Sequence, residues 1–162
     1  FGGFVSFVDR IKDSTIETVA AAKQMNIAIT VITGDALKVA EAVGREAGLV
    51  TESAEVTEAA AFLTLPQAER KKRLSSIRVF ARTTPEQKLE LIQLLKEQFT
   101  VGYLGEGIND APALKAAHVS MVVQSAADVA RETADIVLLQ NDLRVIVEGI
   151  RFGRETHANT MK

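Results

Sequence analysis

The sequence lacks several features that would define a function directly. It contains no cysteine, which excludes disulfide bonds, thiolate metal sites and cysteine nucleophiles. The net charge is only −2 and the few aromatic residues follow no base-stacking pattern, so we expect no nucleic acid as a partner. No uninterrupted apolar run approaches the roughly 18 residues that span a bilayer, and no signal peptide is recognisable. From this composition we expect a soluble fragment of a protein.

The residues that are present suit one compact α/β domain. With 162 residues, of which 47% are hydrophobic and 25% charged, the chain is long enough to bury a core. Strands are predicted at residues 4–8, 27–32, 77–80, 101–104, 119–123 and 136–139. Helices are predicted at residues 14–25, 36–47, 85–98 and 110–117, with a short helix before the last strand, and Gly48 is a plausible C′ residue of the second helix. This alternation predicts a parallel sheet with helices on both faces.

Two regions depart from the alternation. Residues 51–76 are polar and are predicted to form an excursion with one short helix after Pro66 and no strong strand. The basic run within them is predicted to be a solvated face. Residues 143–162 are predicted to form an amphipathic helix, because apolar side chains repeat there at helical spacing. We therefore expect a domain over residues 1–142, followed by a separate helix over 143–162.

The most informative segment is the loop at residues 105–114, which reads Gly-Glu-Gly-Ile-Asn-Asp-Ala-Pro-Ala-Leu. It follows a predicted strand and precedes a helix, and ligands bind at the carboxyl ends of strands in open α/β sheets. Its glycines let the backbone approach a small anion or a metal shell closely. Glu106 and Asp110 offer two carboxylates, which Mg²⁺ commonly takes together with waters and a substrate phosphate. A lone Gly-x-Gly of this kind is more often an ordinary turn with a helix cap at Asn109 or Asp110.

A second loop follows the predicted strand at residues 27–32 and reads Thr33-Gly34-Asp35. It offers a hydroxyl and free backbone N–H groups at the start of a helix, which together can form a phosphate cradle. Taken alone, such a turn is more often structural.

A third cluster opens the helix predicted at residues 85–98. Thr84 can cap this helix, Pro85 fits its first position and Gln87 completes a capping box, which places Lys88 one turn into the helix. The helix macrodipole disfavours a lysine near the amino end of a helix. Attraction between the ammonium and a nearby anion would offset this unfavourable energy. The default alternative is an exposed helical lysine.

These three segments, in this order, resemble the motifs of P-type cation-transporting ATPases. The matching strings are Ile-Thr-Gly-Asp at residues 32–35, Phe-Ala-Arg-Thr-Thr-Pro-Glu-Gln-Lys at 80–88 and the loop at 105–114. The chain is similar to the C-terminal part of the phosphorylation domain of such a pump, and it looks most like the magnesium-transporting and related bacterial pumps. The resemblance implies a haloacid dehalogenase-like, Rossmann-like parallel sheet, with Mg²⁺ and ATP as cofactors.

The resemblance also implies roles for the first two motifs. Thr33 would donate a hydrogen bond to the transferred phosphoryl group, and Gly34 would offer its backbone N–H. Asp35 would face the nucleotide, with Arg82 beside it. Lys88 would neutralise phosphoryl charge, as catalysis of this transfer requires.

In the third motif, the resemblance implies that Glu106 and Asp110 hold the catalytic Mg²⁺ and that Asn109 belongs to the catalytic set. One residue departs from the family pattern, because Glu106 stands where the family has aspartate. Mg²⁺ demands near-ideal octahedral geometry, so the additional methylene can shift the ion, insert a water or abolish direct contact.

The family's nucleophile motif, Asp-Lys-Thr-Gly, does not occur in this sequence. The resemblance places that motif on the central strand of the sheet, so we expect this chain to lack the strand that carries the nucleophile and to be inactive by itself. The expected partners are the nucleotide-binding domain, the actuator domain and the transmembrane helices of the parent pump. This domain would lie on the cytoplasmic side of a cell membrane, with residues 143–162 as a stalk towards a membrane segment.

Two other functional classes remain open from the sequence. A stand-alone phosphatase of the same superfamily would need its own Asp-x-Asp motif, and none precedes Thr33. A non-catalytic module would bind Mg²⁺ or nucleotide, or dock to the rest of a pump, without turnover.

Overall fold

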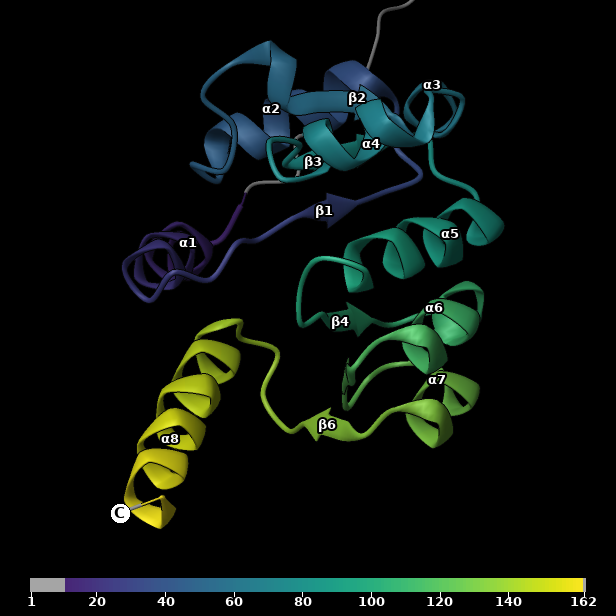
Figure 1. Ribbon diagram of the computed structural model, residues 1–162. Coiled ribbons are helices and arrows are strands. Elements are labelled where there is room, and N and C mark those ends of the chain that lie inside the picture. The colour runs from purple at the N-terminus through teal and green to yellow at the C-terminus, as the bar shows by residue number, and fades with distance from the viewer. Residues whose placement is uncertain (1–10, 162) are drawn as a thin grey trace, which may run out of the picture.

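The computed structural model describes residues 11–161, so the strand predicted at residues 4–8 lies outside the described part. Within that part, the strands are β1 (Val31–Ile32), β2 (Val56–Glu58), β3 (Val79–Ala81), β4 (Gly102–Gly105), β5 (Val119–Val123) and β6 (Ile136–Leu138). The helices are α1 (Asp13–Gln24), α2 (Leu37–Glu46), α3 (Ala59–Leu63), α4 (Gln67–Leu74), α5 (Pro85–Lys96), α6 (Ala111–Ala116), α7 (Asp128–Thr133) and α8 (Arg144–Thr160). Figure 1 shows their arrangement.

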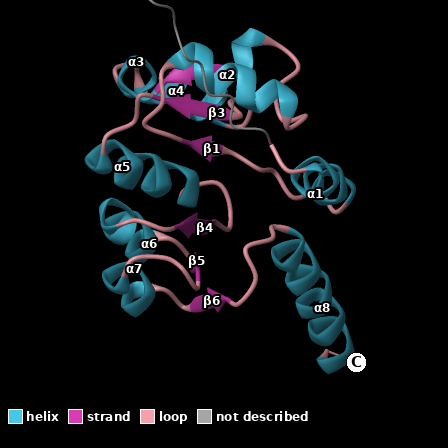
Figure 2. Cartoon of the chain, turned by 180° about the vertical axis from the view of Figure 1, so that it is seen from behind, coloured by secondary structure: helices cyan, strands magenta, loops and turns pink. Residues whose placement is uncertain are grey.

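The strands form two parallel sheets of three strands each, in the orders β1-β3-β2 and β4-β5-β6. In both views β1 and β4 are the strands of the two sheets that face each other across a gap, and they point the same way (Figure 1 and Figure 2). Among the strands described, β1 pairs only with β3 and β4 only with β5. The facing backbone edges of β1 and β4 are therefore not joined in one continuous sheet.

Helices cover both faces of the first sheet, as the alternation of strands and helices predicts. Val79 and Ala81 of β3 are fully buried in a cluster with residues of α1 and α2. Phe80 points the other way and packs with α3, α4 and α5, where its ring meets Phe62 edge-on at 5.0 Å between ring centroids. This alternation along β3 follows from the two-residue period of a strand.

The second sheet is covered by α6 and α7, and a shared core connects it to the first. Leu114 of α6 and Ala130 of α7 are buried against Val122 of β5. A further buried cluster contains Ile92 of α5, Val101 and Ala113 of α6, and it links α5 to the helices that cover the second sheet. The prediction of an α/β fold with parallel strands and packed helices is confirmed, whereas the structure divides the strands between two sheets.

Residues 51–76 contain more structure than the sequence pattern predicts. The helix after Pro66 is present as α4, but the expectation of a single helix was wrong, because α3 precedes it, and a short strand, β2, pairs in parallel with β3. The region also buries Phe62 and Leu74 in the core. The strand was missed because it is only three residues long, half-buried and partly polar, so it carries no period-2 signal that can be recognised.

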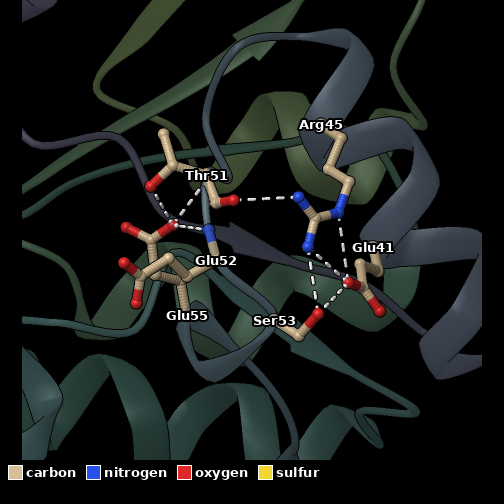
Figure 3. Close-up of polar contacts among 6 residues, drawn as sticks. All are labelled: Glu41, Arg45, Thr51, Glu52, Ser53 and Glu55. Atoms are coloured by element: carbon tan, nitrogen blue, oxygen red, sulfur yellow. Dashed lines mark hydrogen bonds and ion pairs between the residues drawn. The ribbon is translucent and has the colours of Figure 1, made fainter.

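A polar network fixes the chain that enters β2 (Figure 3). The Arg45 guanidinium of α2 donates to Glu41 at 2.9 Å, to the Thr51 carbonyl at 2.9 Å and to the Ser53 hydroxyl at 3.0 Å. Hydrogen bonds from Ser53 and Arg45 lower the pKa of Glu41. The Glu55 carboxylate accepts from the Thr51 backbone N–H at 2.6 Å. The network explains how such a polar segment holds one conformation next to α2.

The C-terminal helix α8 packs through its first half. Leu143, Ile146, Val147 and Ile150 are half-buried, and α8 contacts α1. Residues 151–160 are exposed, with Arg154 donating to the Met25 carbonyl at 2.8 Å. In the described range, 11–161, no helix combines the length and apolar character needed to cross a membrane.

We expect backbone amide protection in α8 to fall after about Phe152. The reason is that the apolar side chains of residues 144–150 are half-buried while residues 151–160 are exposed, and helix ends without packing partners open locally. Hydrogen exchange followed residue by residue on the chain checks this expectation. Uniform protection through Thr160 in a monomer would contradict it and favour a self-contained domain.

Candidate functional site

The three sequence motifs all lie at the carboxyl ends of parallel strands. Thr33 directly follows β1, Arg82 directly follows β3 and Glu106 directly follows β4. Because β1 and β4 point the same way, their loops leave the sheets at the same edge (Figure 1). This is the edge where open α/β sheets bind ligands.

Lys88 is held by the third motif through a short ion pair. Helix α5 begins at Pro85 with the predicted capping box, in which the Gln87 N–H donates to the Thr84 hydroxyl at 3.3 Å and the Thr84 N–H to the Gln87 side chain at 3.0 Å. One turn later, Lys88 Nζ lies 2.7 Å from Asp110 Oδ1. Both side chains are largely buried, with exposed fractions of 17% and 11%. The sequence indicated an anion near this ammonium, and within the chain that anion is Asp110.

Asp110 sits at the centre of the hydrogen-bond network around the loop. Its Oδ1 accepts from Lys88 Nζ and from the Tyr103 hydroxyl at 2.9 Å, and its Oδ2 accepts from the backbone N–H groups of Glu106 at 3.3 Å and Gly107 at 3.2 Å. Burial raises the pKa of Asp110, but the hydrogen bonds from Lys88, from the two amides and from Tyr103 together lower it below its usual value. The carboxylate is therefore charged and tightly held at neutral pH.

The close packing around Asp110 depends on a glycine at position 105. A Cβ atom at Gly105 would lie 2.8 Å from Asp110 Cβ, 3.2 Å from Asp110 Cγ and 3.2 Å from Tyr103 Cε1. Real Cβ atoms essentially never come as close as the first of these distances. The first glycine of the motif is therefore required by sterics in this fold.

The Thr33-Gly34-Asp35 loop is half-buried at Thr33 and exposed at the other two residues. Thr33 Oγ1 donates to Asp35 Oδ2 at 2.8 Å and accepts from the Asp35 backbone N–H at 3.2 Å. A Cβ at Gly34 would have 3.8 Å to its nearest neighbour, the Thr83 carbonyl. Sterics do not require glycine here, unlike at position 105.

Backbone hydrogen bonds join this loop to the one after β3. The Thr83 N–H donates to the Thr33 carbonyl and the Arg82 N–H donates to the Asp35 carbonyl, both at 2.9 Å. Arg82 adopts the left-handed backbone conformation, with φ of 50°, which is uncommon for a residue other than glycine. Its guanidinium lies 3.3 Å from Glu58 at the end of β2, with the Arg82 side chain largely exposed and Glu58 half-buried. The first motif and the start of the second are thus connected.

The structure therefore forms two connected groups from the predicted site residues. One contains Lys88 and Asp110 with the loop at 105–110, where the side chains of Glu106 and Asn109 are exposed. The other contains Thr33, Gly34, Asp35 and Arg82.

Sequence reasoning missed two polar residues that contact predicted site residues. Glu58 pairs with Arg82, and its strand was itself missed, so the sequence carried no signal for it. Tyr103 donates to Asp110, and its one available signal was its position two residues before the Gly-Glu-Gly loop.

The donors present fit Mg²⁺ but do not form a complete protein cage. Within residues 11–161, no group of three or more His, Asp or Glu side chains is placed to hold a metal ion. Mg²⁺ usually takes one or two carboxylates and keeps waters and a substrate phosphate as its remaining ligands. Glu106 and Asp110 supply that number of carboxylates on one loop at the carboxyl edge of the strands.

Comparison with known proteins identifies the family. A model described as haloacid dehalogenase-like hydrolase matches residues 2–118. The chain belongs to this family. This haloacid dehalogenase-like domain is 41% identical over 161 residues to the magnesium-transporting ATPase, P-type 1, of Salmonella typhimurium and to that of Escherichia coli. The match covers 99% of the chain but only 18% of each relative.

Solved structures agree with the haloacid dehalogenase-like fold. A crystal structure of a zinc-transporting PIB-type ATPase in the E2.Pi state superposes with a TM-score of 0.72 at 28% identity, covering 93% of this chain and 20% of that protein. The domain thus matches the phosphorylation-domain part of P-type ATPases, as its motifs indicate, and it spans about a fifth of the length of these relatives.

Proposed function

We propose that this haloacid dehalogenase-like domain supplies the Mg²⁺-holding and phosphate-stabilising residues with which a P-type cation pump forms and hydrolyses an aspartyl-phosphate. The observation that carries the proposal is the buried Lys88–Asp110 pair at 2.7 Å, formed between two motifs at the carboxyl edge of parallel strands. Bound Mg²⁺ neutralises phosphoryl charge and orients the transferring group. Glu106 and Asp110 are the residues that would hold it.

Each of the other motif residues has a task that follows from its chemistry. Lys88 carries a positive charge that Asp110 keeps in place, so it can neutralise a phosphoryl oxygen without reorganisation. Thr33 and the Gly34 N–H are hydrogen-bond donors at the end of β1 and would bind a phosphoryl oxygen once the Thr33 hydroxyl turns from Asp35. Asn109, exposed on the same loop as Asp110, completes the catalytic set. Arg82 and Asp35 would contact the nucleotide.

The nucleophile has to come from outside this sequence, and the sheet topology supports a place for it. The edges of β1 and β4 face each other, point the same way and are not paired with each other (Figure 2). One further parallel strand between them would make the two sheets continuous and would bring its carboxyl end to the three motif loops. We assign this place to the strand with the nucleophilic aspartate.

The proposed parent is a membrane pump with this domain on its cytoplasmic side. The identity of 41% to magnesium-transporting ATPases over nearly the whole chain supports this assignment. The partners are then the nucleotide-binding domain, the actuator domain and the transmembrane helices, with ATP and Mg²⁺ as ligands. In such a pump, α8 would lead from the domain towards the membrane.

The proposal predicts that the 162-residue chain by itself hydrolyses no ATP and forms no acyl-phosphate. The physical reason is that an attacking oxygen has to lie in line with the phosphorus at about 3 Å, and the residues here offer phosphate ligands without the family's nucleophile. Incubation with γ-labelled ATP and Mg²⁺, followed by an acid quench, should leave the protein unlabelled. Stoichiometric acid-stable label would overturn the assignment of the nucleophile to another segment.

The proposal also predicts that Glu106→Asp keeps or strengthens Mg²⁺ affinity in a full-length pump that carries this chain. Aspartate restores the family residue and shortens the side chain by one methylene, which suits the short ligand distances of Mg²⁺. The half-saturating Mg²⁺ concentration for phosphorylation measures the effect, with Glu132→Asp on α7 as a matched control. A loss of affinity of tenfold or more in Glu106→Asp alone would contradict the metal assignment.

A further inference from the structure

Tyr103 makes a contact that none of the three motifs explains. It is the single tyrosine of the chain and lies in β4, where its half-buried ring packs against the clusters around Leu114 and Ile92. Its hydroxyl donates to Asp110 Oδ1 at 2.9 Å, and Lys88 Nζ reaches the same oxygen at 2.7 Å. A phenylalanine would provide the same apolar ring, so the hydroxyl has to be explained by its contact with the carboxylate.

The hydroxyl completes the hydrogen bonding of Asp110. A carboxylate offers about four lone-pair directions, two on each oxygen. Lys88 and Tyr103 engage both directions of Oδ1, and the N–H groups of Glu106 and Gly107 engage both directions of Oδ2. Rotation of the carboxylate would break several of these bonds at once. Its orientation is therefore fixed, and a metal ion can contact it only by displacing one of the four donors.

Of these four donors, the Tyr103 hydroxyl can be removed with the smallest effect on the rest of the site. Lys88 carries a charge, and the two N–H groups belong to the backbone of the loop. Burial, together with the charge of Asp110 and the hydrogen bond to it, raises the pKa of Tyr103, so the phenol remains a neutral donor at physiological pH. Gly105 permits the arrangement, because a Cβ there would lie 3.2 Å from the Tyr103 ring.

We propose that Tyr103 is a positioning residue that sets the Mg²⁺ affinity of this site by sharing the Asp110 oxygen with Lys88. The inference rests on the proposed function. Removal of the phenol hydroxyl leaves one lone pair of Asp110 free and its charge less compensated, so Mg²⁺ binds more tightly. The carboxylate and the Lys88 ammonium also become less fixed, so turnover slows. Opposite changes in affinity and turnover distinguish this role from simple damage to packing, which weakens both.

The first test is the Tyr103→Phe variant, with Met121→Leu on the neighbouring strand as the control for a packing change without a lost hydrogen bond. Titration calorimetry of the 162-residue chain with MgCl₂ should show the Mg²⁺ Kd lowered by about threefold to tenfold in Tyr103→Phe and unchanged in the control, since the net contribution of one hydrogen bond is of that size. In a full-length pump that carries this chain, kcat should fall by a similar factor while the KM for ATP stays constant.

A second measurement needs no variant. Because Tyr103 is the only tyrosine, its ring resonances are a resolved reporter in NMR spectra of the wild-type chain. Saturation with Mg²⁺ should shift them, since the metal competes with the phenol for Asp110. Resonances that stay in place through saturation, or a Mg²⁺ Kd in Tyr103→Phe equal to or weaker than that of wild type, would overturn the role of Tyr103 and leave the proposed function standing. A wild-type chain that binds no Mg²⁺ would overturn the metal site and this inference together.

Discussion

Replacing Asp110 by alanine should abolish phosphorylation in a full-length pump that carries this chain. The substitution removes the acceptor of four hydrogen bonds, and it leaves Lys88, whose side chain is only 17% exposed, without its counter-charge. Breaking a buried ion pair by removing one partner costs about 3–5 kcal/mol of folding free energy, so the isolated chain should also unfold at lower urea concentration. Acid-quenched labelling with γ-labelled ATP measures the first effect, and urea unfolding the second.

Asp110→Asn separates the two effects. The amide keeps the shape of the side chain and one oxygen for the loop N–H groups, so part of the stability lost in Asp110→Ala should return. It lacks the charge that holds Lys88 and attracts Mg²⁺, so phosphorylation should remain at the background level. Normal phosphorylation in either variant would show that Asp110 has no part in the metal site.

Replacing Gly105 by alanine should be nearly as damaging, although no functional group is changed. The new methyl group would lie 2.8 Å from Asp110 Cβ, so Asp110 or the strand end has to move. Overpacking of this kind costs about 1–3 kcal/mol of stability. A displacement of about 1 Å at a phosphoryl-transfer site lowers the rate by roughly a hundredfold. Urea unfolding of the chain and phosphorylation of a pump that carries it are the two measurements.

The chain provides a matched control for the glycine substitution. Gly149 lies in α8, and a Cβ atom added there would have no neighbour within 4 Å, so alanine fits without contact. Helix propensity favours alanine over glycine by about 1 kcal/mol, so Gly149→Ala should stabilise the chain and leave phosphorylation unchanged. Equal effects of the two substitutions would show that the tight packing at Gly105 is not what the loop depends on.

The sequence correctly predicted features, such as helix caps, that depend on interactions among a few neighbouring residues. The capping box at Thr84 and Gln87 starts α5 where expected, and Gly48 after α2 has the left-handed φ of 71° that a C′ residue takes. The strand predicted at residues 119–123 is β5. For the capping box and the C′ glycine, the sequence window contains the groups that determine the local structure.

Features that depend on partners distant in the sequence could not be predicted in the same way. The strand predicted at residues 27–32 is shorter in the structure, where only the two residues of β1 pair with β3. The length of a strand depends on the neighbouring strands with which it can pair. The Lys88–Asp110 pair joins residues 22 positions apart, and the Arg82–Glu58 pair depends on a strand that had no signal of its own. The motifs indicated candidate site residues, whereas the contacts among these residues became known only from the fold.

The backbone bonds between the loops after β1 and β3 have a mechanical consequence. They lie beyond the ends of the parallel β1–β3 ladder and do not follow its register, because the Thr83 N–H donates to the Thr33 carbonyl and the Arg82 N–H donates to the Asp35 carbonyl. Two backbone hydrogen bonds tie the loops together, so a domain rotation that displaces one of these loops carries the other with it. In the proposed pump, the groups on the two loops would then stay at a constant distance from each other while the domain rotates.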